Sequence, residues 1–464
     1  MDTIRLGLIP AHRGVMDRNF SIDRRGRLLR AFSGIPGVQL VAPSEELTAG
    51  GLVSNERDAQ AVTELFQGQR LDGIVLAVLG YGDEKSALAI VESFRGLPVH
   101  LLAMKEPVPD GGFLQGASVG GMLPISYGLH KRNIPFTFAG VFNPEDPRLA
   151  AELASFARVC RAVRKFRGAR VGMIGFRPYD FEVCIFNEGL LLEKYGAKTV
   201  PLNLIDLEHQ ITEIADNDPR VGRIVQEIRA AFSSGCSAAE IGKLAKLEIV
   251  MLRLAEEYRL DALTIQCWSA IQERIGLTPC LTNGRISTRG IPVACEGDTL
   301  GALSLLLQQW LAGDGAVPWL ADILMLHPEE EDLFLAWHCG NAPAGLAAEG
   351  GGAKLRGHCS WEEGFAGGLA TSELMVKPGP VSANRIVEHH GQFKLLHVDG
   401  EMVKRNDRMR GSWGWVKVAD RERMLRTVVE EGFVHHVSIV HGDLAPRIRE
   451  ACRYLDMKLV EVAR

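Results

Sequence analysis

Short apolar runs alternate with helix-like stretches through the first third of the chain, and this alternation restricts the possible folds more than any other feature. Four of the apolar runs are predicted to be strands: Ile4–Ile9, Val38–Ala42, Gly73–Val78 and Val99–Met104. Stretches with a helical spacing of apolar residues lie between them, such as Asp58–Phe66 and Glu84–Phe94. Strand–helix alternation at this spacing is typical of βαβ units. We therefore expect a parallel sheet covered by helices.

A second set of strands and helices begins at about residue 169. It includes a predicted strand over Ala262–Gln266, and Asp298 is placed to cap a helix over Thr299–Leu311. The chain has 464 residues, which is more than one hydrophobic core usually serves. We expect a first α/β domain over residues 1–168 and a second over residues 169–313.

The pattern changes after residue 313, where short strand-like runs replace the alternation. These predicted strands are Asp322–Leu326, Leu333–Cys339, Phe393–Val398, Glu401–Lys404, Trp413–Val418 and Phe433–Val440. Asp399-Gly400 separates two of them, which is a strong signal for a two-residue β-hairpin turn. Residues 314–464 are therefore predicted to form a mostly antiparallel, barrel-like β domain. The expected fold is α/β, with two Rossmann-like domains that contain parallel sheets, followed by this β domain.

Composition and charge argue against several classes of protein. The net charge is −5, from 52 basic and 57 acidic residues that are interspersed, so neither nucleic acid nor an anionic membrane is expected as a partner. The first residues lack the pattern of a signal peptide, and no apolar run reaches the roughly 18 residues that suggest a membrane span. The nine cysteines are scattered without a CxxC pair, which indicates buried thiols in a reducing compartment. We expect a cytoplasmic protein.

Acidic and histidine side chains stand at the ends of predicted elements. Glu296 follows the predicted strand Ile291–Cys295 and precedes a helix, and the carboxyl ends of strands line the ligand crevice in open α/β sheets. Asp322 begins the next apolar run, and His338 lies in the strand-like run after it. Each alone also fits an ordinary role, as a solvated loop carboxylate or a core histidine. Together they offer carboxylate oxygens and imidazole, a ligand set suited to Mn²⁺ or Mg²⁺.

Two adjacent histidines lie within the predicted strand Phe433–Val440. Because adjacent strand residues point to opposite faces, only one of His435 and His436 is expected to face a given site. His441, just after this run, is a third candidate ligand. No HExxH or other tight zinc-binding spacing occurs, so any metal ligands must come from distant parts of the chain.

A series of short motifs resembles the metal-site region of L-fucose isomerase-like proteins. The motifs are Thr264-Ile-Gln-Cys-Trp268, Gly290-Ile-Pro-Val-Ala-Cys-Glu-Gly-Asp298, Gly301-Ala-Leu303, Ala321-Asp-Ile323, Trp337-His-Cys-Gly340 and Val434-His-His-Val437. They match in order and approximate spacing. Near the start, Pro10-Ala-His-Arg-Gly14 matches the basic N-terminal segment of these proteins. The chain is thus similar to the L-fucose isomerase/L-arabinose isomerase superfamily, which has two α/β domains and a C-terminal β domain.

The resemblance implies a metal-dependent aldose–ketose isomerase whose divalent metal is usually Mn²⁺. Glu296 and Asp322 would be both metal ligands and the acid/base pair, and His436 would be a further metal ligand. Strand alternation would then turn His435 away from the site. His338 aligns with a ligand position in the arabinose branch, whereas the fucose branch uses no equivalent ligand.

The resemblance also implies which residues contact the substrate. Gln266 would touch its hydroxyl groups, and Trp268 belongs to the same motif. Independently of the resemblance, Arg13, Arg18, Tyr81 and Arg177 lie near predicted strand ends or loops, where they could contact the far end of a substrate, although each also fits a surface interaction. A cluster of arginines would suit a phosphate, carboxylate or sulfonate group. The chain is shorter than a typical fucose isomerase and diverges near its N-terminus, which leaves the sugar open.

The family assembles as homo-oligomers, hexamers or trimer-based, with active sites near subunit interfaces. The segment His12–Arg18 would then approach the metal site of another subunit. A small-molecule sugar is the expected substrate, and no further partner is implied.

Aldose–ketose interconversion explains why carboxylates and a cation occur together. The reaction moves one proton between C1 and C2 and another between O1 and O2, so it needs two groups that carry protons and a cation that polarises the carbonyl. Two alternatives remain open: other enediolate chemistry, by an epimerase or lyase acting on an acidic sugar, and a sugar-binding homologue without catalysis. The presence of both Glu296 and Asp322 favours an enzyme, because a binding protein needs no proton-transfer pair. No GxGxxG motif follows any predicted strand, so a Rossmann dehydrogenase is not expected.

Overall fold

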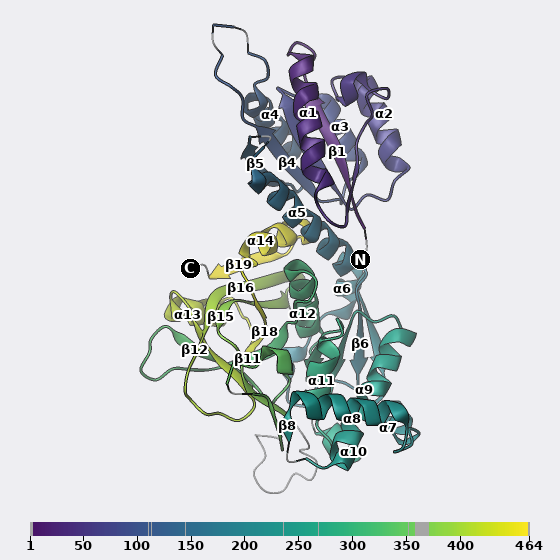
Figure 1. Cartoon of the computed structure of the whole chain (residues 1–464), viewed down its shortest axis with the longest axis vertical. Coiled ribbons are helices and arrows are strands. Elements are labelled where there is room, and N and C mark those ends of the chain that lie inside the picture. Colours follow the sequence, from purple (N-terminus) through teal and green to yellow (C-terminus); the bar gives the residue numbers. More distant parts are fainter. Residues whose placement is uncertain are drawn as a thin grey trace. The chain divides into compact units, whose positions relative to one another are not determined.

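The computed structural model describes residues 3–109, 111–112, 114–143, 145–234, 236–267, 269–350, 352–357 and 371–462. The chain forms two compact units: Met1–Arg164 with Arg449–Asp456, and Lys165–Ile448 with Met457–Arg464. Figure 1 labels their helices and strands. Among the described helices, none has both the length and the apolar character that crossing a bilayer requires.

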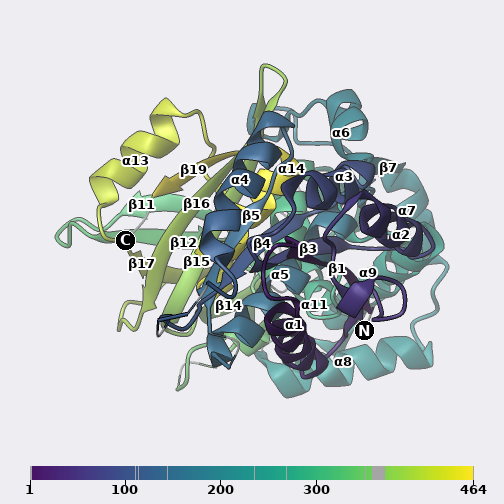
Figure 2. The ribbon, with the colours of Figure 1, turned by 90° about the horizontal axis from the view of Figure 1, so that it is seen from above.

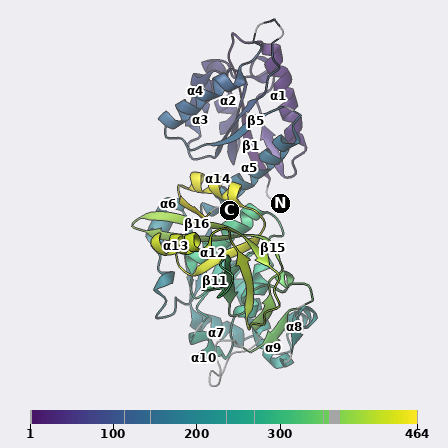
Figure 3. The ribbon, with the colours of Figure 1, turned by 90° about the vertical axis from the view of Figure 1, so that its left-hand side faces the viewer.

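The first unit is built around a parallel sheet whose described strands run in the order β2-β1-β3-β4-β5. The strands are β1 (Ile4–His12), β2 (Val38–Val41), β3 (Gly73–Gly80), β4 (Val99–Met104) and β5 (Thr137–Phe142). The helices are α1 (Arg18–Ser33), η1 (Ala49–Gly51), α2 (Glu56–Gln67), α3 (Glu84–Ser93), α4 (Ser118–Lys131) and α5 (Pro147–Phe166). Helices α2, α3 and α4 cover one face of the sheet, and α1 and α5 cover the other (Figure 3).

This sheet confirms the parallel arrangement predicted from the sequence. Every residue of β3 and β4 is buried, as expected for central strands that are covered by helices on both faces. Gly73 begins β3, and a Cβ atom there would come within 2.5 Å of the Sγ atom of Cys160 on α5. Glycine at this position therefore allows α5 to pack directly on the sheet.

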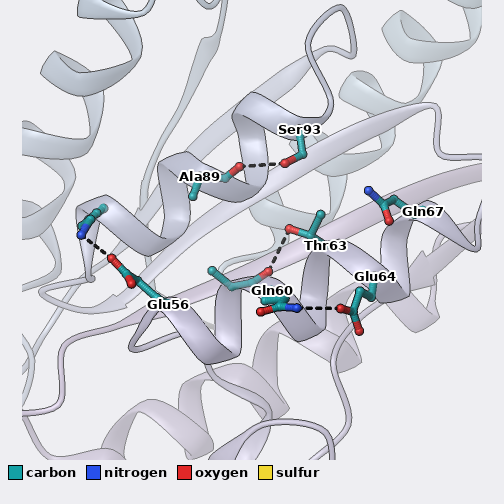
Figure 4. A pocket seen from close by; sticks show the side chains of 9 residues that line it. Glu56, Gln60, Thr63, Glu64, Gln67, Ala89 and Ser93 are labelled. Atoms are coloured by element: carbon teal, nitrogen blue, oxygen red, sulfur yellow. Dashed lines mark hydrogen bonds and ion pairs between the residues drawn. The ribbon is translucent and has the colours of Figure 1, made fainter.

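A surface hollow of about 410 Å³ lies between α2 and α3 (Figure 4). Its polar side chains are occupied locally: Gln60 donates a hydrogen bond to Glu64, and the hydroxyl of Thr63 donates to the carbonyl oxygen of Ala59. None of the site residues predicted from the sequence lines this hollow. It is therefore not the candidate active site.

The second unit begins with another parallel sheet, in the order β10-β9-β6-β7. Its strands are β6 (Arg170–Ile174), β7 (Lys198–Leu202), β9 (Ala262–Ile265) and β10 (Val293–Cys295). The accompanying helices are η2 (Glu182–Cys184), α6 (Glu188–Tyr195), α7 (Leu204–Thr212), α8 (Pro219–Ala231), α9 (Ala238–Glu257), α10 (Ala270–Ile275), α11 (Cys280–Ser287) and α12 (Thr299–Ala312). The predicted cap is confirmed, because the side chain of Asp298 accepts a hydrogen bond from the backbone N–H of Gly301.

A closed antiparallel barrel follows in the same unit. Its described strands are β11 (Trp319–Leu326), β12 (Leu333–His338), β15 (Gly379–His389), β16 (Gln392–Val403), β17 (Ser412–Lys417) and β18 (His436–His441). They pair in the order β16-β15-β18-β11-β12-β17, and pairing between β16 and β17 closes the barrel. This confirms the predicted fold class, two parallel α/β sheets followed by a barrel-like β region.

Further elements extend the barrel. The additional strands are β8 (Ser233–Ser234), β13 (Lys354–Arg356), β14 (Thr371–Met375) and β19 (Lys458–Val462), and the remaining helices of this unit are η3 (Ala344–Leu346) and α13 (Arg421–Glu430). Helix α14 (Ala445–Leu455) follows, and its residues from Arg449 onward belong to the first unit. Strand β19 pairs in parallel with β16, and α13 packs near β19 (Figure 2). Whether the second parallel sheet and the barrel are separate domains, divided at residue 313, stays a prediction.

Helix α12 connects the second sheet to the barrel. It contacts β9 and β10 of the sheet, and also β15 and β18 of the barrel (Figure 1). Almost every side chain of α12 is buried, as expected for a helix that is covered on all sides. The residues just before this helix are therefore held between the two sheets.

The predicted hairpin turn at Asp399-Gly400 is wrong, because both residues lie inside the continuous strand β16. A Cβ atom on Gly400 would lie 2.5 Å from Cγ1 of Val416 and 3.0 Å from the backbone oxygen of Lys417. The glycine thus marks the close approach of β17, not a turn. The turn between β15 and β16 is His390-Gly391, where both residues have positive φ angles of 52° and 80°, as a type I′ hairpin requires.

Candidate active site

Glu296 occupies a sharp turn between β10 and α12. It has a φ angle of 62°, which is uncommon for a residue with a side chain, and its side chain is buried. Gly297 follows with a φ of 69°, and a Cβ atom there would come within 2.8 Å of the backbone nitrogen of Arg177. The close backbone of Arg177 restricts this turn, and the positive φ angle of Glu296 is a strained conformation of the kind that often marks functional sites.

Asp322 and His436 approach Glu296 from the barrel. They are paired residues in the antiparallel register of β11 and β18, so their side chains leave the same face of the barrel wall. The Nε2 atom of His436 lies 2.8 Å from Oε2 of Glu296 and 3.7 Å from Oδ1 of Asp322. Two distant carboxylates and one imidazole thus converge at the sheet–barrel junction.

Asp298 fixes the orientation of the His436 ring. Its Oδ2 atom lies 2.8 Å from Nδ1 of His436, and both side chains are buried. Asp298 also accepts a hydrogen bond of 3.1 Å from the guanidinium of Arg385, which is 1% exposed. With the Nδ1–H donating to Asp298, Nε2 is the atom directed at Glu296 and Asp322, and it can bind a cation when the cation displaces the second ring proton. This carboxylate–histidine pairing is the usual support for a metal-ligating histidine.

Several buried polar atoms in this site lack a hydrogen-bonding partner among the described residues: Oε2 of Glu296, Oδ1 of Asp322, Nε2 of His436 and Nε2 of His338. Nε2 of His436 and Oε2 of Glu296 are close, but they are not aligned as a hydrogen bond. Leaving such atoms unpaired in the interior is costly. Carboxylate oxygens and an imidazole nitrogen that face one another in this way fit a divalent cation as their common partner.

The His436 imidazole and the Glu296 carboxyl each shift the pKa of the other toward its charged form. Burial disfavours the charged form of His436, but hydrogen bonds with Asp298 and Cys184 outweigh it and raise the pKa of this imidazole well above its ordinary value. Burial alone would raise the pKa of the Glu296 carboxyl, but the imidazoles of His436 and His338 outweigh it and hold the pKa below its usual range. Glu296 is therefore a carboxylate at neutral pH, suited to accept a proton or to bind a cation.

His338 ends strand β12 and is buried beside the same site, with its ring centroid 6.5 Å from that of His436. Its Nδ1 atom accepts a hydrogen bond of 2.9 Å from the backbone N–H of Cys339, which leaves Nε2 to face the site. Burial opposes the charged form of His338, but Cys295 and the nearby carboxylates outweigh it and raise the pKa of this imidazole.

The inference that His435 points away from the site is wrong. Strand β18 begins only at His436, so strand alternation does not apply to the residue before it. The Nε2 atom of His435 lies 3.9 Å from Oδ1 of Asp322, and His435, His436 and Asp322 together form a possible ligand group. His441, by contrast, donates a hydrogen bond from Nε2 to the backbone oxygen of Lys377.

The remaining predicted residues of the second unit lie along the carboxyl edge of its sheet. Gln266 follows β9, beside Glu296 after β10, because β9 and β10 pair in parallel. The Oε1 atom of Gln266 accepts a hydrogen bond of 3.2 Å from the backbone N–H of Phe176. Arg177 follows β6 and lies against Gly297. Trp268 lies outside the described residues.

Arg13 and Tyr81 belong to the first unit and contact each other. The guanidinium carbon of Arg13 lies 4.8 Å from the centre of the Tyr81 ring, and its Nε donates a hydrogen bond to the backbone oxygen of Gly82. Both residues follow adjacent parallel strands, β1 and β3, where the strand order of the sheet reverses. This is the position at which open α/β sheets bind ligands.

Sequence reasoning missed several residues that shape the site. Asp298 was expected only to cap a helix, although its position two residues after Glu296 is a usable signal. No sequence motif near Arg385 or Cys184 indicates a role in the site, because their contacts with Asp298 and His436 join segments that are far apart in the chain. Long-range pairs of this kind become visible only in the folded structure.

Comparison with known proteins places the chain among isomerases. Residues 7–167 match the model of the fucose/sulfoquinovose isomerase N-terminal domain, and residues 336–463 match that of the L-fucose isomerase C-terminal domain. A sulfoquinovose isomerase of Alkalicoccus urumqiensis is 28% identical over 398 residues, which cover 84% of this chain and 86% of that protein. A sulfoquinovose isomerase of Priestia aryabhattai is 25% identical over 411 residues, covering 88% and 89% of the two chains. One from Clostridium sp. (strain MSTE9) is 24% identical over 358 residues, covering 75% and 76%.

The matched domains and the similarity along most of the chain define a sugar isomerase. The chain belongs to the fucose isomerase-like family, as the motifs around Glu296, Asp322 and His436 predicted.

Proposed function

We propose that this protein is a metal-dependent aldose–ketose isomerase that acts on sulfoquinovose, a sulfonated aldose, through an enediolate intermediate. The observation that carries the proposal is the convergence of Glu296, Asp322 and His436, whose buried, facing atoms lack hydrogen-bonding partners among the described residues. The names of the relatives supply the substrate.

Glu296, Asp322 and His436 would hold the cation, Mn²⁺ or Mg²⁺, because oxygen-rich sites with one imidazole suit these ions. A bound dication of this kind polarises the substrate carbonyl as a Lewis acid. Asp298 contributes by keeping the proton of His436 on Nδ1, so that Nε2 remains free to bind. His435 lies close enough to Asp322 to complete the ligand set, whereas His338, whose Nδ1 accepts a hydrogen bond, would donate from Nε2 to the bound sugar.

The two carboxylates would divide the proton transfers. One removes the proton from C2 of the aldose and returns it to C1 of the ketose, while the other carries the hydroxyl proton from O2 to O1. No group on the protein is changed at the end of this cycle. General acid–base steps of this type typically contribute about 10²–10⁴-fold each. Glu296, whose pKa is held below its usual range, is ionised at neutral pH as a base must be.

Arg177 is the guanidinium that we assign to the sulfonate group. Its backbone lies against Gly297, the neighbour of Glu296, and its side chain is partly exposed. Among the described residues, its Nη1 makes a long hydrogen bond of 3.5 Å to the backbone oxygen of Phe181, and its guanidinium carbon lies 5.6 Å from the centre of the Phe176 ring. Guanidinium groups bind planar or trigonal arrays of anionic oxygens through two parallel hydrogen bonds. Arg177 is therefore suited to bind the sulfonate group of the sugar.

Two further parts of the proposal concern assembly and location. We expect a homo-oligomer, hexameric or trimer-based, in the cytoplasm, with active sites near subunit interfaces. His12–Arg18, together with Tyr81, would then approach the metal site of another subunit. A monomer with full activity in solution, measured by light scattering at the assay concentration, would contradict this arrangement.

A substrate comparison tests the proposed function. Purified protein with Mn²⁺ is offered sulfoquinovose, glucose, L-fucose and L-arabinose, and ketose formation is followed by NMR. We expect sulfoquinovose to give the highest kcat/KM. Arg177→Met should raise KM for sulfoquinovose and leave the weak turnover of neutral sugars unchanged, whereas Arg170→Met, at the opposite end of β6, should change neither. Inversion at a carbon without ketose formation would favour the epimerase alternative, loss of a fragment would favour a lyase, and binding without turnover would favour a non-catalytic homologue.

A further inference from the structure

The rings of His338 and His436 are held in opposite ways, although both imidazoles are buried in the candidate active site. Nδ1 of His436 lies 2.8 Å from the carboxylate of Asp298, which accepts a hydrogen bond. Nδ1 of His338 instead accepts a hydrogen bond of 2.9 Å from the backbone N–H of Cys339, a group that can only donate. Nδ1 of His436 is therefore a donor, whereas Nδ1 of His338 is an acceptor.

The Nε2 atom of His338 carries a proton in either charge state of the ring. While Nδ1 accepts from Cys339, a neutral ring has its single proton on Nε2. A doubly protonated ring also has a proton on Nε2, so the ionisation state of His338 does not alter this conclusion. This N–H donor is buried and has no hydrogen-bonding partner among the described residues. A buried donor of this kind is costly unless a ligand accepts its hydrogen bond.

The same hydrogen bond makes His338 unsuitable as a metal ligand. A ligating histidine binds the ion through the lone pair of one nitrogen and usually donates the N–H of the other nitrogen to a carboxylate, a carbonyl oxygen or water. His436 meets this condition through Asp298. Ligation through Nε2 of His338 would require its proton to move to Nδ1, where it would oppose the N–H of Cys339. The two histidines are therefore suited to different tasks.

The surroundings of His338 place its donor beside the proposed metal ligands. Its ring centroid lies 6.5 Å from that of His436, and the charges of Asp322 and Glu296 act on its imidazole. Oδ1 of Asp322 and Oε2 of Glu296 are buried and lack a hydrogen-bonding partner in the described part of the chain, as Nε2 of His338 does. A sugar whose oxygens reach these carboxylates therefore also comes within reach of the His338 donor.

We infer that His338 is a catalytic hydrogen-bond donor and not a metal ligand, and that its Nε2–H stabilises the negatively charged oxygen of the enediolate. This role rests on the proposed function, because it belongs to the same isomerisation. The carbonyl oxygen of the sugar gains negative charge as the neighbouring carbon loses its proton, so a hydrogen bond to this oxygen strengthens toward the transition state. The proton stays on Nε2 throughout, and the proton transfers remain with Glu296 and Asp322.

Nitrogen NMR of the histidine rings tests the assignment without any turnover. The full-length protein is prepared with isotope-labelled histidine and saturated with Mg²⁺, which is diamagnetic. The two rings are assigned from the resonances that disappear in His338→Gln and in His436→Ala. We expect Nε2 of His338 to carry a proton while Nε2 of His436 carries none. A His338 ring with its only proton on Nδ1 would overturn the inference.

Matched variants test the catalytic role. His338→Leu removes the donor and keeps an apolar side chain of similar size, whereas His338→Gln retains an amide N–H that can replace Nε2–H. We expect kcat for sulfoquinovose to fall by about 10²–10³-fold in His338→Leu with a smaller change in KM, and His338→Gln to recover about 10-fold of this loss. The Mn²⁺ affinity of the chelator-stripped protein should be unchanged in both. His441→Gln is the control, since Nε2 of His441 donates to Lys377 outside the site, and it should match the wild type.

The outcomes separate this inference from the proposed function. Loss of Mn²⁺ affinity in His338→Leu would make His338 a ligand and overturn the inference, while metal-dependent isomerisation by the wild type would stand. A wild-type kcat in His338→Leu would overturn the catalytic role in the same way. If His338→Leu does not fold, a lowered kcat with wild-type Mn²⁺ affinity in His338→Gln supports the inference. A wild type that binds Mn²⁺ but converts no sulfoquinovose would contradict the proposed function and the catalytic role together.

Discussion

Asp322 on β11 and His436 on β18 stand opposite each other in the barrel wall, with Nε2 of His436 3.7 Å from Oδ1 of Asp322. Backbone pairing of two strands therefore sets this distance, independently of any loop. Glu296 reaches the same point from the turn before α12, which packs against both sheets of the second unit. The site is thus preorganised by the junction of the parallel sheet and the barrel, as functional sites on rigid elements require.

Asp298→Asn should weaken Mn²⁺ binding by about 10–100-fold, because it replaces the carboxylate that orients His436. Asparagine remains a good helix cap, so α12 should still form. The measurement is a Mn²⁺ titration of the chelator-stripped protein. Asp420→Asn is the matched control, since Asp420 caps α13 in the same way without contacting the site. Equal Mn²⁺ affinities in the two variants would mean that Asp298 serves only as a cap.

His436→Ala should abolish Mn²⁺ binding at the active site, whereas His435→Ala should keep it and lose part of the activity. His436 is fully buried between Glu296 and Asp298, while the side chain of His435 is 40% exposed and only approaches Asp322. Electron paramagnetic resonance of bound Mn²⁺ and ketose formation are measured on both variants. Loss of Mn²⁺ from His435→Ala together with retention in His436→Ala would reverse the assignment.

Gly400→Ala should destabilise the second unit by about 1–3 kcal/mol, because the added methyl group overpacks the contact between β16 and β17. The clash involves the Cγ1 atom of Val416 and the backbone oxygen of Lys417, which cannot move independently of the strand. Urea unfolding gives the change in free energy. Gly345→Ala is the control, since a Cβ atom there meets nothing within 4 Å. A Gly400 variant as stable as this control would show that the strands separate easily.

The stability of the first unit should depend on pH through Glu450. Burial raises the pKa of this carboxyl above its ordinary value of 4.5. A raised folded-state pKa means that the favourable contribution is complete below the unfolded value and is lost as pH rises through the folded value. Glu450→Gln should therefore stabilise the protein at pH 7.5, and the gain should shrink as the pH falls toward about 4.5. The exposed Glu422→Gln is the control in thermal unfolding, and an equal gain at both pH values would contradict the burial effect.

The fold was predictable from the sequence wherever the spacing of apolar residues along the chain reflected which side chains are buried in the folded protein. Alternating strands and helices correctly indicated both parallel sheets. Strand β15 escaped prediction because its middle, Ser382–Arg385, is mostly polar, although these residues are buried against the rest of the barrel. The hairpin turn predicted at Asp399-Gly400 was wrong because glycine occurs both in turns and where two strands approach closely. Local sequence does not distinguish these two uses.

The candidate site was partly predictable for a similar reason. Glu296 and Asp322 stand at element ends, where chemistry-bearing residues are expected. Arg385, which holds Asp298 in place, comes from a strand that is distant in sequence, and nothing around it indicates that role. The orientation of His435 depended on where β18 begins, and strand boundaries are poorly defined by sequence patterns.

Deuterium exchange during turnover tests the central claim most directly. Chelator-stripped protein is incubated with sulfoquinovose in D₂O, with and without Mn²⁺, and the products are followed by proton NMR. We expect ketose that carries deuterium at C1 only when Mn²⁺ is present, and a loss of more than about 10²-fold in rate for Glu296→Gln and for Asp322→Asn. Conversion that is unaffected by the chelator, or near-wild-type exchange in both carboxamide variants, would contradict a metal-dependent proton transfer by these two residues.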